Sequence, residues 1–330
     1  MQFGRWQPVV VLLILLALLL WWRSPGEPQL YSRTALIMGT VVEIKAYTGD
    51  EKQLDRDITA AFDEMRRVEN QFSSFKPDSE ISQLNQATGP FKVSKETAQL
   101  LQAGQRIARL SDGAFDMGLG RLIKLWGIET DHPHVPTEAE IRETLERVGP
   151  EDLEIDGTTV RKADPELKVD LGGIAKGYAV DRAIEVLRQA GVQSAAVNAG
   201  GDIRLLGDRN GQPWRIGIQH PRDPKAVLAT LPLSNRAVVT SGDYERYFEK
   251  DGIRYHHIFD PTSGRPARLC QSVTVVAADA TTADALATAA FVLGPIKGLK
   301  LLEDQEGVEG LIVTASGDLV QTSGLKRVSP

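Results

Sequence analysis

The stretch Val169-Asp170-Leu171-Gly172-Gly173-Ile174-Ala175-Lys176-Gly177-Tyr178-Ala179 predicts the end of a buried strand, a glycine turn and a helix that continues to about Gln189. Two adjacent glycines lack Cβ atoms, so the backbone can approach a ligand closely. The unpaired N–H groups of the first helical turn then face outward, where a phosphate binds well. Lys176 adds a positive charge near the same place. The alternative is a turn in which the glycines serve packing alone, because a lone glycine turn is weak evidence for a phosphate site.

The composition is that of a globular protein with one large or two modest domains. Of the 330 residues, 42% are hydrophobic and 25% are charged. The net charge is −6 and the sequence has no cluster of Lys and Arg, which argues against nucleic acid as the main partner. Cys270 is the single cysteine, so an intramolecular disulfide is excluded and a metal site would use oxygen or histidine ligands.

The N-terminus predicts a membrane segment. Residues 8–22 are unbroken apolar sequence, with Arg5 before them and Arg23 after them. The run is short for a membrane span, which needs about 20 residues, but it reaches that length if it extends back to Phe3 and Arg5 snorkels to the interface. Two tryptophans occupy the place where a cleavable signal has small residues.

We therefore interpret residues 1–23 as an uncleaved signal-anchor, with a cleaved secretory signal as the alternative. Residues 24–34 begin with a segment rich in Pro and Gly and are expected to be a linker. The folded domain is expected to cover residues 35–330.

Helix and strand signals in residues 35–330 do not alternate regularly, which favours an α+β fold with mixed or antiparallel sheets and flanking helices over a doubly wound parallel sheet. The apolar periodicity and capping residues predict helices over 52–72, 94–110, 120–127, 137–148 and 281–293. Strands are predicted over 36–47, with an interruption at residues 38–40, and over 153–155, 160–162, 195–198, 214–219, 237–240, 244–249, 253–259, 271–277 and 311–314.

Asp284 and Thr288 form the clearest candidate metal site. They are four residues apart, so on a helix they share one face and can reach one ion. A carboxylate and a hydroxyl are hard oxygen donors, which suit Mg²⁺, and Mg²⁺ often completes its shell with phosphates. The alternative is that Asp284 lies in the first helical turn and interacts only with the helix dipole.

His256 and His257, two of the five histidines, precede the turn Asp260-Pro261-Thr262-Ser263-Gly264. On a strand they point to opposite faces, so only one of them can face a given site. A histidine with a pKa near neutral can act as a general base toward a hydroxyl. The other histidine is expected to be structural.

Three further motifs place an apolar or aromatic residue beside a turn: Met38-Gly39-Thr40, Ser74-Phe75 and Asp112-Gly113-Ala114-Phe115-Asp116. Taken singly, each is better explained as core than as a cofactor contact. Together with the glycine turn, the histidine and aspartate segments, Ser79–Asn85 and Asn198–Asp202, they resemble the ApbE family, the FAD:protein FMN transferases. The resemblance extends from about Ala35 to Ser316, and its specificity lies in the ordered set.

The resemblance implies a two-lobed domain, related to the T-fold, that binds FAD in a cleft between its lobes. The implied FAD contacts are Met38 and Phe75 at the flavin end, Ala114, Phe115 and Asp116 along the adenosine, Gly172, Lys176 and Tyr178 near the pyrophosphate, and Ile258 in the cleft. Many relatives have tyrosine at the position of Phe75, which lacks that hydroxyl. Asp284, Thr288 and the carbonyl oxygen of Ala175 would hold Mg²⁺, and His257 and Asp284 would be the catalytic residues.

The implied reaction joins FMN from FAD to a Thr or Ser hydroxyl of an acceptor flavoprotein and releases AMP. The implied acceptors are subunits of membrane redox complexes, so the catalytic domain is expected outside the cytoplasm, on an inner-membrane anchor. The alternatives are a Mg²⁺-dependent FAD pyrophosphatase and a non-catalytic FAD-binding protein. Mg²⁺ and Mn²⁺ cannot be distinguished by oxygen ligands alone. Residues 156–159 faintly resemble an acceptor stretch, but a hairpin turn explains them better.

Overall fold

The computed structural model describes residues 29–128, 130–146 and 153–325. Its centre is an eight-stranded sheet in which every neighbouring pair is antiparallel, in the order β1-β2-β6-β7-β10-β15-β16-β17. These strands are β1 (Gln29–Ile37), β2 (Thr40–Thr48), β6 (Ala195–Ala199), β7 (Asp202–Leu206), β10 (Ala237–Gly242), β15 (Cys270–Ala277), β16 (Glu309–Thr314) and β17 (Leu319–Gln321).

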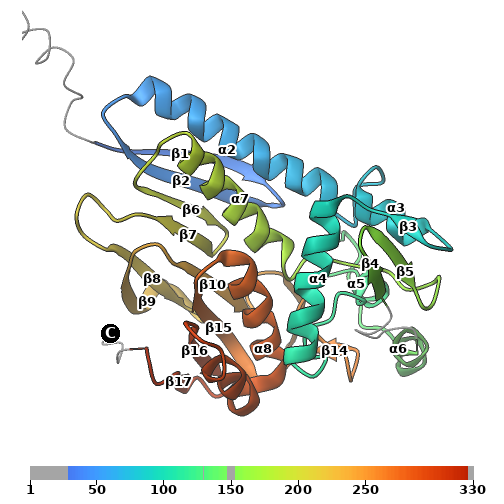
Figure 1. Ribbon diagram of the computed structural model, residues 1–330. Helices are drawn as coiled ribbons and strands as arrows, with labels where there is room; N and C mark the ends of the chain where they lie inside the picture. Colours follow the sequence, from blue (N-terminus) through green and yellow to red (C-terminus); the bar gives the residue numbers. More distant parts are fainter. Residues whose placement is uncertain (1–28, 129, 147–152, 326–330) are drawn as a thin grey trace, which may run out of the picture.

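Helices cover one face of this sheet. α2 (Glu51–Phe72) and α7 (Ala175–Gln189) run side by side, and α8 (Ala280–Glu303) packs against β10, β15 and β16 (Figure 1). α4 (Lys95–Leu110) lies across the ends of these helices and contacts α8. The buried residues of the layer form one core, to which α2 contributes a stripe at helical spacing from Leu54 to Phe72.

A hairpin of two strands covers part of the opposite face. β8 (Trp214–His220) and β9 (Asp223–Leu233) pair with each other and pack on the sheet through a second core that includes Trp214. Adjacent residues of one strand, such as Val238 and Val239, belong to different cores, because successive side chains of a strand point to opposite faces. The sheet therefore separates two apolar layers.

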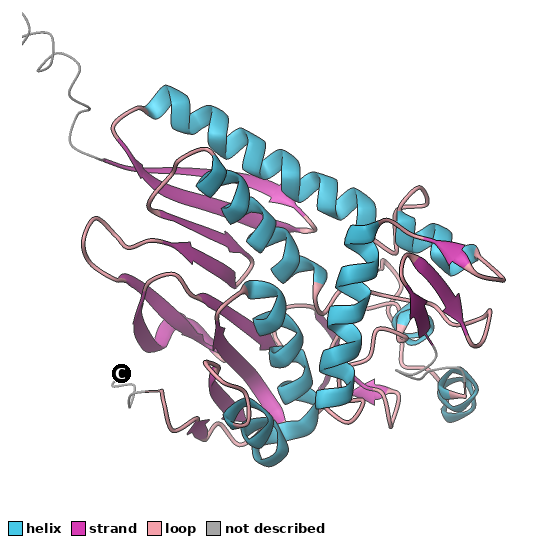
Figure 2. Cartoon of the chain, in the orientation of Figure 1, coloured by secondary structure: helices cyan, strands magenta, loops and turns pink. Residues whose placement is uncertain are grey.

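Shorter elements gather at the end of the molecule away from β8 and β9 (Figure 2). They include a three-stranded sheet in the order β3-β5-β4, three short helices and two hairpins. Their bounds are α3 (Glu80–Gln86), β3 (Phe91–Lys92), α5 (Gly120–Trp126), α6 (Glu138–Leu145), β4 (Leu153–Asp156), β5 (Thr159–Lys162), β11 (Tyr247–Lys250), β12 (Ile253–His256), β13 (Phe259–Asp260) and β14 (Arg265–Pro266). The turn between β4 and β5 contains Gly157, so residues 156–159 are a hairpin turn, as expected.

The helix predictions agree with the structure where it describes the chain. Ser94 and Thr137 cap α4 and α6 through their side chains, and α6 has the predicted capping box with Glu140. α8 consists of two helices joined at a kink, because Gly294 has a φ of 76°, which is not helical, and Pro295 begins the second helix. The first of the two agrees with the helix predicted over 281–293. α8 is long and apolar enough to cross a membrane, but more than half of its most apolar window is buried inside the protein. It is the core helix of the layer.

The strand predictions need correction in several places. Residues 29–34, expected in the linker, form the first part of β1 and pair with β2. β7 and β9 were not expected, since neither has a simple alternating pattern of apolar residues. β3, β14 and β17 were not expected either, and each is only two or three residues long. Val169–Leu171 is buried but is not a strand, because its backbone bonds to other partners. The predicted signal-anchor, residues 1–23, lies outside the described residues.

Asn85 and Met117 are those partners. The amide side chain of Asn85 bonds both the carbonyl oxygen and the N–H of Val169, at 2.8 and 2.6 Å. The N–H of Asp170 donates to the carbonyl oxygen of Met117 at 2.7 Å. These bonds replace a sheet ladder and hold the segment that leads into the glycine turn.

Candidate functional site

A cavity of about 810 Å³ lies where α7 and α8 begin, beside the ends of the central strands. All but one of the site residues predicted from the sequence line it, although they come from segments far apart in the chain. They are Met38, Phe75, Ala114, Phe115, Asp116, Gly172, Ala175, Lys176, His257, Ile258, Asp284 and Thr288. Tyr178 is the exception among the described residues.

The glycine turn forms one wall of the cavity, but its hydrogen bonds differ from the expectation. The N–H groups of Ile174 and Ala175 both donate to the carbonyl oxygen of Leu171, at 3.0 and 2.8 Å. The N–H of Gly172 donates to Asp170 at 2.8 Å. These three groups are therefore already bonded within the turn, and the prediction that the first helical turn offers unpaired N–H groups to a phosphate is wrong for them.

The anion that the start of α7 binds is a carboxylate of the protein itself. The N–H of Gly177 donates to Oδ2 of Asp284 at 3.0 Å. Asp284 is the fifth residue of α8 and is 4% exposed, so an interaction with its own helix dipole does not account for its burial. Burial, and then the charge of Asp202, raise the pKa of Asp284 to about 8, while Lys176 and the Gly177 N–H act in the opposite direction.

Small residues allow α7 and α8 to meet closely at this point. A Cβ atom on Gly177 would lie 2.2 Å from the carbonyl oxygen of Ala280 and 2.8 Å from Cβ of Asp284. A Cβ atom on Gly173 would lie 3.1 Å from the ring of Phe115 and 3.4 Å from Oγ1 of Thr288. The glycines therefore bring the Ala175 turn, Asp284 and Thr288 to one place, as the resemblance implied.

Asp181 fixes the orientation of α8, and the sequence analysis did not single it out. Its carboxylate accepts hydrogen bonds from the N–H groups of Ala280 and Thr281, at 2.9 and 2.8 Å, and from the Thr281 hydroxyl at 2.7 Å. Asp279 caps the same helix by accepting from the Thr282 N–H at 2.7 Å. The sequence signal that could have identified this role was an aspartate on the side of the predicted helix that carries its apolar residues.

The charge of Lys176 is not free in the cavity. Its ammonium lies 3.0 Å from the carboxylate of Asp202, which follows the Gly200-Gly201 turn and is 1% exposed. Glu245 also lines the cavity, and burial raises its pKa. Asp202, Asp284 and Glu245 thus bring three acids near Lys176, and Arg246 adds a further basic residue to the wall.

The donor set at Asp284 suits a divalent cation. The three expected ligands, the Asp284 carboxylate, the Thr288 hydroxyl and the Ala175 carbonyl oxygen, all line the cavity. All are hard oxygen donors, which suit Mg²⁺ or Mn²⁺. The raised pKa of Asp284 reflects a buried carboxylate that a cation would stabilise. Over the described residues, His, Cys, Asp and Glu form no metal-binding group of three or more.

The two histidines have different surroundings, as predicted. Nε2 of His256 lies 2.6 Å from the carbonyl oxygen of Ala267, and its Nδ1 accepts from the Ile258 N–H at 3.2 Å. Both of its ring nitrogens are engaged, so His256 is structural. Ile258 itself is buried and lines the cavity.

His257 faces the cavity. Its Nδ1 lies 3.3 Å from the carbonyl oxygen of Arg246. A carbonyl oxygen only accepts, so Nδ1 carries the proton, and the lone pair on Nε2 is left to accept one. Burial, and then the charge of Arg246, lower the pKa of His257 to about 3. The ring is therefore neutral at pH 7.

Met38 occupies an unusual backbone position. Met38 and Gly39 have φ values of 54° and 69°, which form the two-residue turn between β1 and β2. Asn or Gly usually occupies the first of these positions, because a larger side chain is strained there. Phe75, across the cavity, is 64% exposed.

Ala114, Phe115 and Asp116 follow the end of α4. Asp112 and Gly113 have φ values of 50° and 82° and turn the chain, and the N–H of Phe115 donates to the Ser111 hydroxyl at 3.0 Å. Phe115 is 3% exposed. The carboxylate of Asp116 accepts from the N–H of Gly118 at 2.6 Å. This turn brings the three residues from α4 to the cavity wall.

Asp170 is a second residue that sequence reasoning left without a role. Its carboxylate accepts from the Ser74 hydroxyl at 2.5 Å and from the Gly172 N–H at 2.8 Å. It therefore ties the segment after α2 to the glycine turn, and both line the cavity. Asp170 lies in the Val169–Ala179 stretch, two residues before the glycine turn, and this position could have indicated a role at the site.

Tyr178 does not contact the cavity in the way the resemblance implied. Its hydroxyl donates to Glu96 of α4 at 2.7 Å, and its ring meets Phe72 edge-on with centroids 5.7 Å apart. Tyr178 comes three residues after Ala175, so its side chain projects from α7 on the side of α2 and α4.

Comparisons with known proteins point to one family. The ApbE family model matches residues 38–312. The chain is 37% identical to the FAD:protein FMN transferase of Klebsiella pneumoniae, over 92% of this chain and 96% of that protein. It is 41% identical to the FAD:protein FMN transferase of Vibrio cholerae, over 81% of this chain and 82% of that protein.

Solved structures agree with this. The crystal structure of the ApbE protein from Thermotoga maritima matches with a TM-score of 0.83 and 39% identity, over 89% of this chain and 97% of that one. The flavin transferase ApbE from Vibrio cholerae matches with a TM-score of 0.81 and 35% identity, over 92% of this chain and 100% of that one.

Proposed function

The chain belongs to the ApbE family, and from this premise we propose that it is a FAD:protein FMN transferase. The enzyme moves FMN from FAD to a Ser or Thr hydroxyl of an acceptor flavoprotein and releases AMP. The observation that carries the proposal is the convergence of the glycine turn, His257 and the Asp284–Thr288 edge of α8 on one cavity. That cavity, of about 810 Å³, is within the size range of ligand pockets.

The cavity is the FAD cleft. One side consists of the starts of α7 and α8 and the strand ends around Met38 and His257, and the other of the segments 72–76 and 114–128. Met38 and Phe75 contact the flavin end, and Ala114, Phe115 and Asp116 line the adenosine part. The pyrophosphate lies by the glycine turn, where Gly172 has no side chain to fill the space.

His257 receives the proton of the acceptor hydroxyl. The acceptor oxygen bonds to the FMN-side phosphorus of FAD, the bond from that phosphorus to the bridging oxygen breaks, and AMP leaves with the bridging oxygen. The hydroxyl proton goes to Nε2 of His257, whose Nδ1–H is held by the Arg246 carbonyl oxygen. The pKa of about 3 keeps Nε2 unprotonated at pH 7, but it makes the ring a weaker base than the near-neutral histidine expected from the sequence.

Asp284, Thr288 and the Ala175 carbonyl oxygen would hold Mg²⁺. When bound, the ion would neutralise charge on the pyrophosphate and stabilise the leaving phosphate. Asp284 is kept in place for this by the Gly177 N–H, and Lys176 by Asp202. The protein's own part is therefore to position the two ends of FAD against the acceptor.

The decisive experiment uses the protein without residues 1–28, FAD, Mg²⁺ and an acceptor domain, and measures the mass of that domain and the AMP released. We expect the acceptor mass to increase by bound FMN, with one AMP for each FMN joined. AMP release without a mass increase would indicate a FAD pyrophosphatase instead. FAD binding without AMP under any condition would indicate a flavin-binding protein.

The acceptor is a flavoprotein subunit of a membrane redox complex, and the catalytic domain works outside the cytoplasm, held to the inner membrane by residues 1–23. The apolar run between Arg5 and Arg23 supports this proposal. Intact mass of the protein purified from membranes tests it, with an N-terminus at Met1 as the expected result. A mature chain that begins beyond Arg23 would contradict the anchor.

A further inference from the structure

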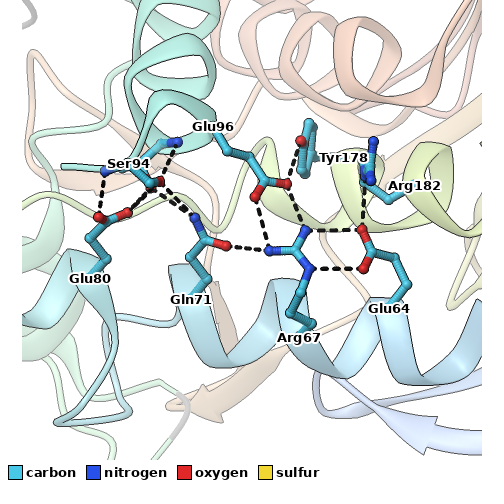
Figure 3. A network of polar contacts seen from close by, with 9 residues as sticks. Glu64, Arg67, Gln71, Glu80, Ser94, Glu96, Tyr178 and Arg182 are labelled. Carbon is cyan, nitrogen blue, oxygen red and sulfur yellow. Dashed lines mark hydrogen bonds and ion pairs between the residues drawn. The ribbon is translucent and has the colours of Figure 1, made fainter. Parts of the chain in front are cut away.

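Three helices meet in a polar network beside the cavity (Figure 3). Arg67 of α2 is at its centre. The guanidinium donates to both carboxylate oxygens of Glu64, at 2.8 and 3.0 Å, and to both oxygens of Glu96 on α4, at 2.7 and 2.9 Å. Arg182 of α7 donates to Glu64 at 2.9 Å. The network therefore joins α2 to both α4 and α7.

Arg67 holds the Glu96 carboxylate in the position where Tyr178 can donate to it. Burial alone would raise the pKa of Glu96, but hydrogen bonds from Arg67 and Tyr178 outweigh it and lower that pKa. The carboxylate is therefore a charged acceptor in a defined place, and hydrogen bonds to charged groups are stronger than neutral ones. Gln71 supports the same region by donating to the hydroxyls of Ser94 and Thr97, at 2.9 and 3.1 Å.

Tyr178 links this network to both walls of the cavity. It directly follows Gly177, whose N–H holds Asp284, and it lies three residues after Ala175. Its ring packs edge-on against Phe72, the last residue of α2, which lines the cavity with the segment that follows. A side chain from the first turn of α7 thus contacts the end of α2 and the start of α4.

The first turn of α7 depends on such contacts. Ile174, the residue that precedes the helix, makes no side-chain capping bond. The turn is instead held by Asp284 on the α8 side and by Tyr178, which bonds to Glu96 of α4 and packs against Phe72 of α2. A movement of the turn toward or away from α2 would change the width of the cavity between Phe72 and the glycines.

We propose that Tyr178 is a positioning residue for FMN transfer, which sets the spacing between the glycine turn of α7 and the C-terminal end of α2. It acts through Glu96 and Phe72 and does not touch the substrate. This inference rests on the proposed function, since it assigns FAD to the space between those two segments.

The test compares Tyr178→Phe with the unaltered protein, both without residues 1–28. The substitution removes only the hydroxyl and keeps the ring against Phe72. We expect the dissociation constant for FAD, measured by quenching of flavin fluorescence without an acceptor, to rise at least about fivefold. The KM for FAD should rise in parallel, while kcat at saturating FAD stays within about twofold, because no group that contacts the reacting atoms is changed.

Two further variants complete the experiment. Tyr31→Phe removes a comparable bond, from the Tyr31 hydroxyl to Asp55 at 3.2 Å near the start of α2, and should leave the FAD affinity unchanged. Glu96→Gln weakens the same link from the other partner and should raise the FAD dissociation constant. Glu96→Gln also weakens the ion pair with Arg67, so its effect should be at least as large as that of Tyr178→Phe. The double variant should bind FAD about as tightly as Glu96→Gln alone, because the Tyr178 hydroxyl acts through Glu96.

The inference is overturned if Tyr178→Phe and Glu96→Gln lower the melting temperature but bind FAD as tightly as the unaltered protein, since the network would then be structural only. Failure of the proposed function looks different. In that case the unaltered protein binds FAD but does not modify an acceptor, and the effect of Tyr178→Phe on FAD affinity can still be measured.

Discussion

At the scale of single residues, the cavity is notable for buried acids. Asp202, Asp284 and Glu245 share it with Lys176 and Arg246. Burying a carboxylate costs free energy unless a partner compensates for it, and the pKa of Asp284, raised to about 8, reflects that cost. A bound cation would offset the free-energy cost of burying the Asp284 carboxylate. Mutation of Asp284 therefore tests whether this residue binds the metal.

Asp284→Asn tests this interpretation. The amide oxygen can still accept the Gly177 N–H, so the contact between α7 and α8 is kept while the charge is lost. We expect FMN transfer to fall by about two orders of magnitude or more, and the melting temperature to stay the same or rise. Asp304→Asn, at the exposed end of α8, is the control. Transfer at the normal rate in Asp284→Asn would remove Asp284 from the metal site.

His257 leads to a prediction about pH. Its pKa is about 3 in the folded protein and about 6.5 in an unfolded chain, so only the unfolded state gains a proton as the pH falls below 6.5. The stability that this difference contributes is complete above pH 6.5 and is lost as the pH falls toward 3. The loss should be on the order of 1 kcal/mol at pH 5.5.

Urea unfolding at pH 7.5 and 5.5 measures the effect. His257→Gln should lose less stability than the unaltered protein over this interval, whereas His132→Gln, on the exposed surface, should behave like the unaltered protein. His256 contributes in the same direction, because burial lowers its pKa as well. Equal losses in all three proteins would mean that His257 is not shielded from water.

At the scale of secondary structure, the site depends on how α7 and α8 begin. α7 has no side-chain cap of its own, and α8 has the Asp279 cap together with bonds to α7. Asp181 of α7 accepts from the first N–H groups of α8, and Asp284 of α8 accepts from the Gly177 N–H of α7. Each helix therefore supplies a carboxylate that binds the N-terminal end of the other, an arrangement that helix dipoles favour.

Gly177→Ala tests how close this contact must be. Alanine is the better helix former by about 1 kcal/mol, but its Cβ would lie 2.2 Å from the Ala280 carbonyl oxygen. We expect a net loss of about 1–3 kcal/mol in the free energy of unfolding, together with weaker FAD binding as Asp284 moves. Gly89→Ala, which meets no atom within 4 Å, should change neither quantity.

Unfolding by urea and a fluorescence titration with FAD are the two measurements. A Gly177→Ala protein as stable as the unaltered one would show that α7 and α8 can separate without cost.

At the scale of the whole molecule, the central sheet separates two cores. The layer of α2, α7 and α8 builds the cavity, while β8 and β9 pack on the other face around Trp214, which meets Tyr47 with ring centroids 6.2 Å apart. The residues of the second core are distinct from those that line the cavity. Stability and FAD binding should therefore respond differently to changes on the two faces.

Trp214→Ala examines this separation. Removing a large buried ring should cost about 3–5 kcal/mol of stability, measured by urea unfolding. The folded protein should nevertheless bind FAD within about twofold of its normal affinity, because the cavity lies on the other side. A large loss of FAD affinity at low temperature, where the variant is folded, would show that the two layers are coupled through the sheet.

The sequence by itself determined the class of fold, the helices α2, α4, α6 and α7, and all but one of the proposed site residues that meet in the cavity. Helical periodicity and side-chain caps are local signals, so Ser94 and Thr137 could be recognised without the rest of the chain. The cavity residues could be recognised because the ordered motifs resemble one family, and the family model and the relatives confirm that resemblance.

Only the tertiary structure decided what these residues bond to. The Gly177 N–H binds Asp284 and not a free phosphate, Lys176 pairs with Asp202, and Tyr178 turns to Glu96. The physical reason is the same in each case. Hydrogen bonds and ion pairs between residues 26 to 107 positions apart depend on how helices pack, and a pattern along the chain contains no information about which distant partner satisfies a given group.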